Sequence, residues 1–143
     1  MIIREAMTED LKTMALLWRM MVKEVRPGSE MNTEWWLNFQ KELMGTEVYR
    51  AYVAIECGEM VGYAVGMIYP DALTGKVVAF GQDIYIMPEC RNDKVVGNMY
   101  GKLVRLGKEK GAKAIEMLCF ESQLEMWKNK GYNVHTYHVR REI

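Results

Sequence analysis

An arginine and a lysine stand close together where a predicted strand meets a predicted helix. The segment from Ile84 to Arg91 reads as a strand and a tight turn, and a long amphipathic segment begins at Asp93. A helix that begins there directs its unpaired N–H groups and the positive end of its dipole toward the end of the strand. Arg91 and Lys94 add fixed positive charge at the same place. This combination predicts a site for an anion such as a phosphate.

The helix is predicted from the spacing of its apolar residues. They recur at intervals of one, three and four and so share one face: Val95, Val96, Met99, Tyr100, Leu103 and Val104. Gly111 ends the segment. Between residues 91 and 113, seven residues are basic and two are acidic, although the whole chain has a formal net charge of zero. The local positive charge fits an anion site, and it equally fits an ordinary solvent-facing helix surface.

Helices and strands are also predicted on both sides of this point. One helix runs from Leu11 to Val25, and a second follows a cap at Asn32 or Thr33 and ends before Gly45. The predicted strands span residues 2–4, 48–56, 60–69, 76–87, 114–119 and 131–141. The second to fourth suit an antiparallel meander, whereas the fifth would run parallel to the fourth after a crossover helix.

Three segments, taken in order, resemble the Gcn5-related N-acyltransferase (GNAT) superfamily, whose members move an acetyl group from acetyl-CoA to an amine. Ile3-Arg4-Glu5-Ala6 with Asp10 resembles its first strand and helix start. Residues 84–91 resemble its fourth strand and the Pro-x-x-Arg start of its pyrophosphate loop, and residues 127–132 resemble its late aromatic-x-x-x-Gly-aromatic signature. The resemblance implies an α+β fold, in which a mixed, mostly antiparallel sheet of about six to seven strands carries helices on both faces. We expect one domain over residues 1–143.

The resemblance also implies where acetyl-CoA binds. In that family the fourth and fifth strands splay apart, and the pantetheine arm enters the gap. Carried over to this chain, the strand backbone of Ile84, Tyr85 and Ile86 would meet the arm. The residues implied to surround the pyrophosphate or lie beside the cofactor are Arg91, Asn92, Asp93, Lys94, Val96, Gly97 and Trp127. No metal is implied.

The pyrophosphate loop departs from the family pattern. The pattern has two glycines where this chain has Lys94 and Val96, and Gly97 stands one place late. Glycine allows the backbone to approach a phosphate closely, which Lys and Val do not. Lys94 could offset this loss by pairing with a phosphate directly.

The catalytic residues implied by the resemblance are an acid and a base. Asp83, on the fourth strand, is the candidate base, because the amine must be neutral before it can attack. Asp83 fits equally well a structural role, as a polar residue at a strand end whose carboxylate accepts hydrogen bonds from backbone N–H groups. At the position of Trp127, many family members have a tyrosine that protonates the departing thiolate. The indole of Trp127 has no such acid chemistry. Trp127 also fits a core position. Candidate substitutes for the acid are Tyr132, Tyr85, Cys119 and Ser122, of which we select Tyr132.

The acceptor amine would lie between the first two helices and the last strands. Near that side by position are Trp18, Glu24, Arg26, Trp35 and Tyr69, whose aromatic members fit an acceptor with apolar parts or a plain core. His135 and His138 would point to opposite faces of the last strand, so one of them could line the cleft.

Composition restricts the class of protein further. No run is long enough to cross a bilayer, and the first residues lack the pattern of a signal peptide, so we expect a soluble cytoplasmic protein. Cys57, Cys90 and Cys119 have neither disulfide-framework nor zinc-site spacing.

Two functions from different classes follow. The first is an N-acetyltransferase in which an amine, on a small molecule or a protein, attacks acetyl-CoA directly. The second is a GNAT-like binding or structural module that has lost catalysis and still holds CoA. A homodimer is compatible with either, whereas neutral overall charge argues against nucleic-acid binding.

Overall fold

A five-stranded sheet forms the centre of the protein, with strand order β1-β2-β3-β4-β5. The computed structural model describes residues 1–119, 121–135 and 139–143. The strands are β1 (Ile2–Glu5), β2 (Tyr49–Glu56), β3 (Glu59–Pro70), β4 (Val77–Ile86) and β5 (Ile115–Met117). The helices are α1 (Leu11–Val25), α2 (Thr33–Leu43), α3 (Asp93–Glu109) and α4 (Leu124–Asn129). Short 3-10 turns span Thr8–Asp10, Pro88–Cys90 and Glu121–Gln123.

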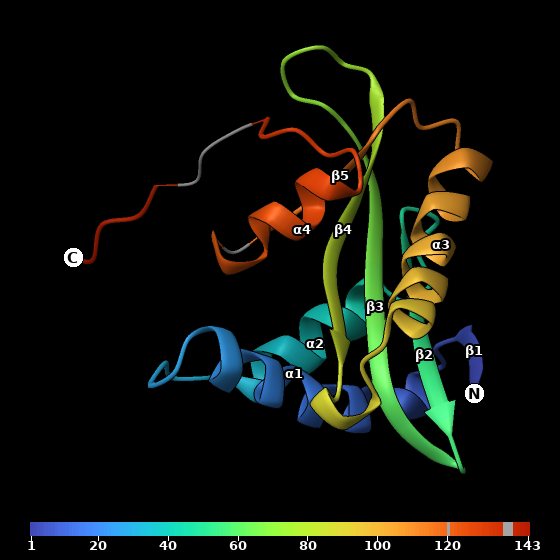
Figure 1. Ribbon diagram of the computed structural model, residues 1–143, viewed down its shortest axis with the longest axis vertical. Helices are drawn as coiled ribbons and strands as arrows, with labels where there is room; N and C mark the ends of the chain where they lie inside the picture. The colour runs from blue at the N-terminus through green and yellow to red at the C-terminus, as the bar shows by residue number, and fades with distance from the viewer. Residues whose placement is uncertain (120, 136–138) are drawn as a thin grey trace.

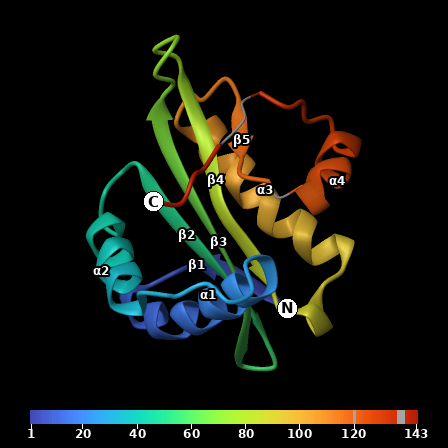
Figure 2. The same cartoon turned by 90° about the vertical axis from the view of Figure 1, so that its left-hand side faces the viewer.

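Helices cover both faces of the sheet, as predicted (Figures 1 and 2). On one face, α1 and α2 bury Met14 and Trp36 against Val53, Tyr63 and Val65 of the sheet. On the other, α3 buries a stripe of apolar residues against the strands: Val95, Met99 and Leu103. Each helix therefore contributes one apolar face, which is the condition for a sheet to be buried on both sides. Within the described residues, no helix is both long and apolar enough to cross a bilayer.

The sheet is antiparallel from β1 to β4, and β5 lies parallel to β4. This confirms the predicted meander and crossover. The predicted count of six to seven strands was too high, because the described residues of the expected last strand, 131–135 and 139–141, form none. Residues 136–138, with His138 among them, lie outside the described residues. Since β5 is only three residues long, its outer edge offers little backbone for another strand.

The start of α3 is fixed by a side-chain cap. The Val95 N–H donates to Oδ1 of Asn92 at 3.0 Å, and Asn92 has the extended backbone of an N-cap. At the other end the chain turns at Gly111, whose φ of 76° suits glycine. The helix therefore begins and ends where the sequence predicts.

We expect Asn92→Ala to lower the free energy of unfolding by about 1 kcal/mol, because the Val95 N–H loses its acceptor. Urea denaturation followed by circular dichroism measures this. The matched control is Asn98→Ala, an exposed position inside the same helix. Equal effects of the two changes would show that the Asn92 side chain contributes nothing as a cap.

Candidate active site

A β-bulge in β4 coincides with the end of its pairing to β5. Val65 of β3 pairs with Asp83 and Gly66 pairs with Gly81, so Gln82 is the extra residue. The pairing with β5 covers only Ala79, Phe80 and Gly81 of β4. Beyond Gly81, the β5-facing edge of β4 therefore has no strand partner among the described residues. This separation matches the splayed strands that the family resemblance implies.

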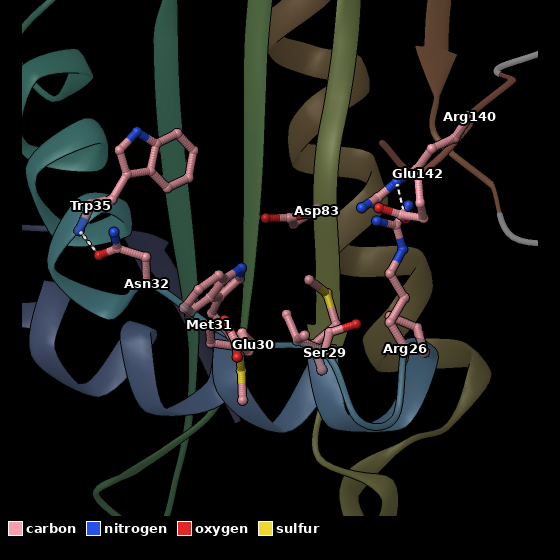
Figure 3. Close-up of a pocket in the computed structure, with 13 residues that line it drawn as sticks. Arg26, Ser29, Glu30, Met31, Asn32, Trp35, Asp83, Arg140 and Glu142 are labelled. Carbon is pink, nitrogen blue, oxygen red and sulfur yellow. Dashed lines mark hydrogen bonds and ion pairs between the residues drawn. The ribbon is translucent and has the colours of Figure 1, made fainter.

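Asp83, the residue after the bulge, projects into a pocket of about 720 Å³ (Figure 3). The walls come from α1, the start of α2, the connection between them and the C-terminal residues. The lining residues are Trp18, Met21, Val22, Val25, Arg26, Ser29, Glu30, Met31, Asn32, Trp35, Asp83, Arg140 and Glu142. One carboxylate on a rigid strand thus faces a cavity built mainly from helices and loops.

The Asp83 carboxyl is withdrawn from solvent, and this raises its pKa from 3.8 to about 6. A hydrogen bond from the Tyr63 hydroxyl, 3.5 Å from Asp83 Oδ2, opposes the rise. Tyr63 is fully buried, and its own pKa is raised well above 10 by burial and by the Asp83 charge. Asp83 is therefore ionised at neutral pH and takes up a proton more readily than an exposed aspartate.

Arg91 is held by three hydrogen bonds to other parts of the protein. Its Nη1 and Nη2 atoms donate to the two carboxylate oxygens of Glu24 at 2.7 and 2.6 Å, and its Nε donates to the Ile86 carbonyl at 2.7 Å. The guanidinium also lies over the Tyr85 ring, 5.3 Å from its centroid. Arg91 thus joins α1 to the loop after β4, and the Ile86 carbonyl already has a donor.

Two backbone donors remain at the start of α3. Among the described residues, the N–H groups of Asp93 and Lys94 have no acceptor, whereas that of Val95 is taken by Asn92. Lys94 and Gly97 line a second groove, of about 620 Å³, which Ile3 of β1 also lines. Because β1 and β5 are opposite edges of the sheet, these two residues lie on the β1 side of α3. Of the residues predicted for the pyrophosphate, Asn92, Lys94 and Gly97 thus share one groove, which Arg91 does not line.

The other side of α3 carries an aromatic cluster of Tyr100, Trp127 and Tyr132. Ring centroids lie 5.2 to 6.1 Å apart, and the hydroxyls of Tyr100 and Tyr132 are hydrogen-bonded. Trp127 is buried, as expected for a core aromatic, but its Nε1 has no partner among the described residues. Burial and the Tyr100 hydroxyl raise the pKa of Tyr132, so this hydroxyl keeps its proton.

The acceptor-side predictions separate into two groups. Trp18, Arg26 and Trp35 line the Asp83 pocket. Tyr69 does not; its hydroxyl donates to Glu116 of β5 at 2.6 Å, and Nε2 of His135 lies 3.8 Å from the same carboxylate. The side chain of Ser122 lies outside the described part of the chain.

The sequence analysis named neither Tyr63 nor the connection between α1 and α2. It did place residues 131–141 beside the acceptor, and Arg140 of that segment lines the pocket, although not as part of a strand. Tyr63 was detectable in part, because alternate residues of a strand lie on the same face of the sheet. Val65 of β3 pairs with Asp83 of β4, so Tyr63, two residues before Val65, lies on the same face as Asp83. The pocket contribution of Glu142 left no such signal, because it lies in no strand or helix.

A model of the acetyltransferase (GNAT) family matches residues 11–132. The chain belongs to this family. The mixed, mostly antiparallel sheet with helices on both faces, which the resemblance implies, is thus confirmed as the fold of an acetyltransferase family, with five strands in place of the six to seven expected.

Solved structures support the same fold at low sequence identity. A putative acetyl transferase from Pyrococcus furiosus superposes with a TM-score of 0.81 at 18% identity, covering 99% of each chain. An acetyltransferase from Trypanosoma brucei gives 0.74 at 18% identity, again over 99% of each chain. The aminoglycoside N-acetyltransferase AAC(6')-Iy, in complex with CoA, gives 0.79 at 19% identity, covering 99% of this chain and 93% of that one. No curated protein sequence matches this chain at a significant level.

The buried charge of Asp83 opposes folding at neutral pH. The unfolded chain releases this proton near pH 3.8 and the folded chain near pH 6, so between these values the folded state holds more protons and its stability falls as pH rises. We expect Asp83→Asn to raise the free energy of unfolding at pH 7.5 by about 2 kcal/mol and to have no effect near pH 3.5.

Urea denaturation at the two pH values checks this prediction. Glu47→Gln, which changes an exposed acid, is the control and should change neither midpoint appreciably. A stability gain for Asp83→Asn of equal size at both pH values would mean that the gain does not come from the ionisation of Asp83.

Proposed function

We propose that the protein is an acetyl-CoA-dependent N-acetyltransferase in which Asp83 accepts the proton of the attacking amine. The observation that carries this proposal is the position of Asp83. Its carboxylate faces a pocket and has a pKa of about 6. Asp83 also stands just beyond Gly81, where the pairing of β4 with β5 ends. A base with a pKa near the working pH combines an ionised state with useful proton affinity.

The separated strands and their surroundings fit a CoA molecule. Buried polar atoms without partners are uncommon in folded proteins. Two atoms that have no partner among the described residues lie on elements around the predicted arm: Oε1 of Gln82 at the bulge and Nε1 of Trp127. The pantetheine arm has amide groups, whose N–H can donate to Oε1 of Gln82 and whose carbonyl can accept from Nε1 of Trp127. The unpaired N–H groups of Asp93 and Lys94 would receive the pyrophosphate.

The reaction is a direct transfer. The amine nitrogen attacks the thioester carbon, the C–N bond forms and the C–S bond breaks, while the displaced ammonium proton passes to Asp83 directly or through water. CoA leaves as a thiolate. The Tyr132 hydroxyl would donate to this sulfur, and because its pKa is raised it acts mainly through a hydrogen bond.

A second candidate function is a CoA-binding module without catalysis. It is favoured by Trp127, a buried indole without acid chemistry that stands where many family members have the tyrosine that protonates the thiolate. The two candidates predict the same binding of CoA but differ in turnover.

Calorimetric titration with CoA tests the binding step. We expect Lys94→Glu to weaken CoA binding about five- to tenfold, since one charge is reversed near the phosphates. Lys108→Glu, the same change at the far end of α3, should have little effect. Equal affinities for all three proteins would exclude Lys94 from the site.

Glu24→Gln tests whether Arg91 takes part. The change releases a guanidinium that is otherwise engaged with a carboxylate, so CoA binding should tighten about threefold or more if Arg91 meets a phosphate. An unchanged affinity would leave Arg91 with a purely structural role.

The pH dependence of acetyl transfer tests Asp83 as the base. We expect kcat/KM to rise with pH through about 6 as Asp83 ionises, and Asp83→Asn to abolish this limb and lower kcat by about 10²- to 10⁴-fold. CoA affinity should not change. An acidic limb that persists in Asp83→Asn would assign the base to another group.

A further inference from the structure

The pocket around Asp83 has an apolar wall. Four side chains of α1 contribute to it, together with one from the connection and one from α2: Trp18, Met21, Val22, Val25, Met31 and Trp35. Trp18 is stacked on the buried Trp36, with ring centroids 5.4 Å apart and planes inclined by 20°. This side of the pocket is therefore braced by the α1–α2 core, and an apolar surface faces the cavity.

Trp35 is the most informative member of this wall because it is 56% exposed. Its ring is stacked on Phe39 at 5.2 Å, and its backbone N–H is held by Oδ1 of Asn32 at 2.9 Å. Figure 3 shows the indole at the same pocket as the Asp83 carboxylate. A large aromatic side chain that is held in place but not covered offers an indole surface that a flat ligand can bury.

The charges of the pocket favour a single ammonium group. Arg140 and Glu142 pair with each other at 2.7 Å. Among the described lining residues, the charges that remain are one cation, Arg26, and two anions, Glu30 and Asp83. One excess negative charge attracts a monocation, whereas a second ammonium group would meet Arg26 and a ligand carboxylate would meet Glu30 and Asp83.

The geometry points to an acceptor that is a primary monoamine carried on an aromatic or similarly flat apolar body, with its nitrogen at Asp83 and its body against Trp35. This inference rests on the proposed function and names the acceptor class of that same pocket. The transfer converts the amine and acetyl-CoA into an amide and CoA, and the proton lost by the amine balances the thiol that forms.

A set of matched small molecules separates the features of this acceptor. The probe is 2-phenylethylamine. Ethanolamine lacks the ring, 2-phenylethanol lacks the charge, phenylalanine adds a carboxylate, and kanamycin adds further ammonium groups. Calorimetry gives the affinity of each compound for the CoA-saturated protein, and thiol release from acetyl-CoA gives the rate with each amine.

We expect 2-phenylethylamine to bind at least about tenfold more tightly than ethanolamine or 2-phenylethanol and to have the highest kcat/KM among the amines. Trp35→Ala should raise its KM about tenfold and leave the affinity for CoA unchanged. The control Leu73→Ala removes an apolar side chain that is 89% exposed in the loop between β3 and β4, and it should change neither value.

Failure of this inference and failure of the proposed function give different results. Acetyl transfer that favours ethanolamine, phenylalanine or kanamycin over 2-phenylethylamine would overturn the acceptor class and keep the acetyltransferase. Selective binding of 2-phenylethylamine that depends on Trp35, without acetyl transfer, would support the acceptor class and reject the transferase. Binding of 2-phenylethylamine no tighter than that of ethanolamine would overturn the inference whatever the enzyme activity.

Discussion

The separation of β4 from β5 is the feature on which the rest of the site depends. Pairing with β5 stops at Gly81, where a Cβ atom would collide with Met117 and lie 3.2 Å from Leu103. Glycine thus allows β5 and α3 to pack closely against β4 at one point, and the bulge at Gln82 redirects the strand immediately after it. A continuous ladder would have filled the gap with hydrogen bonds between strands. The bulge also sets the face on which Asp83 projects toward α1 and α2.

Positive charge near the start of α3 is distributed over several directions. Arg91 is turned toward α1 by Glu24, and Lys94 is turned toward β1, so the N–H groups of Asp93 and Lys94 are the donors that point along the helix axis. Backbone donors do not require glycine at every position, because their direction is set by the helix itself. A loop without the usual glycines therefore still presents two backbone donors that have no acceptor in the described part of the chain.

The sequence predicted the local elements well and the long-range ones less well. The strand segments of the meander, the Asn32 cap and the Gly111 stop depend on neighbours in the chain, and all three agree with the structure. The ion pair between Glu24 and Arg91 joins residues 67 positions apart, and the extra residue at Gln82 is defined only against its partner strand. Trp35 and Trp36 are neighbours on α2, and because neighbouring helix residues project about 100° apart, Trp36 is buried and Trp35 is exposed.

The arrangement of the indoles also has an optical consequence. Two parallel chromophores as close as Trp18 and Trp36 have coupled electronic transitions, so their near-ultraviolet circular dichroism depends on the packing of α1 against α2. Trp127, the remaining buried indole, belongs to α4 and reports on the opposite face of the sheet through its contacts with Tyr100 and Tyr132. The protein thus carries separate intrinsic chromophores for its two helical layers, and partial unfolding of either layer would leave a distinct spectral change.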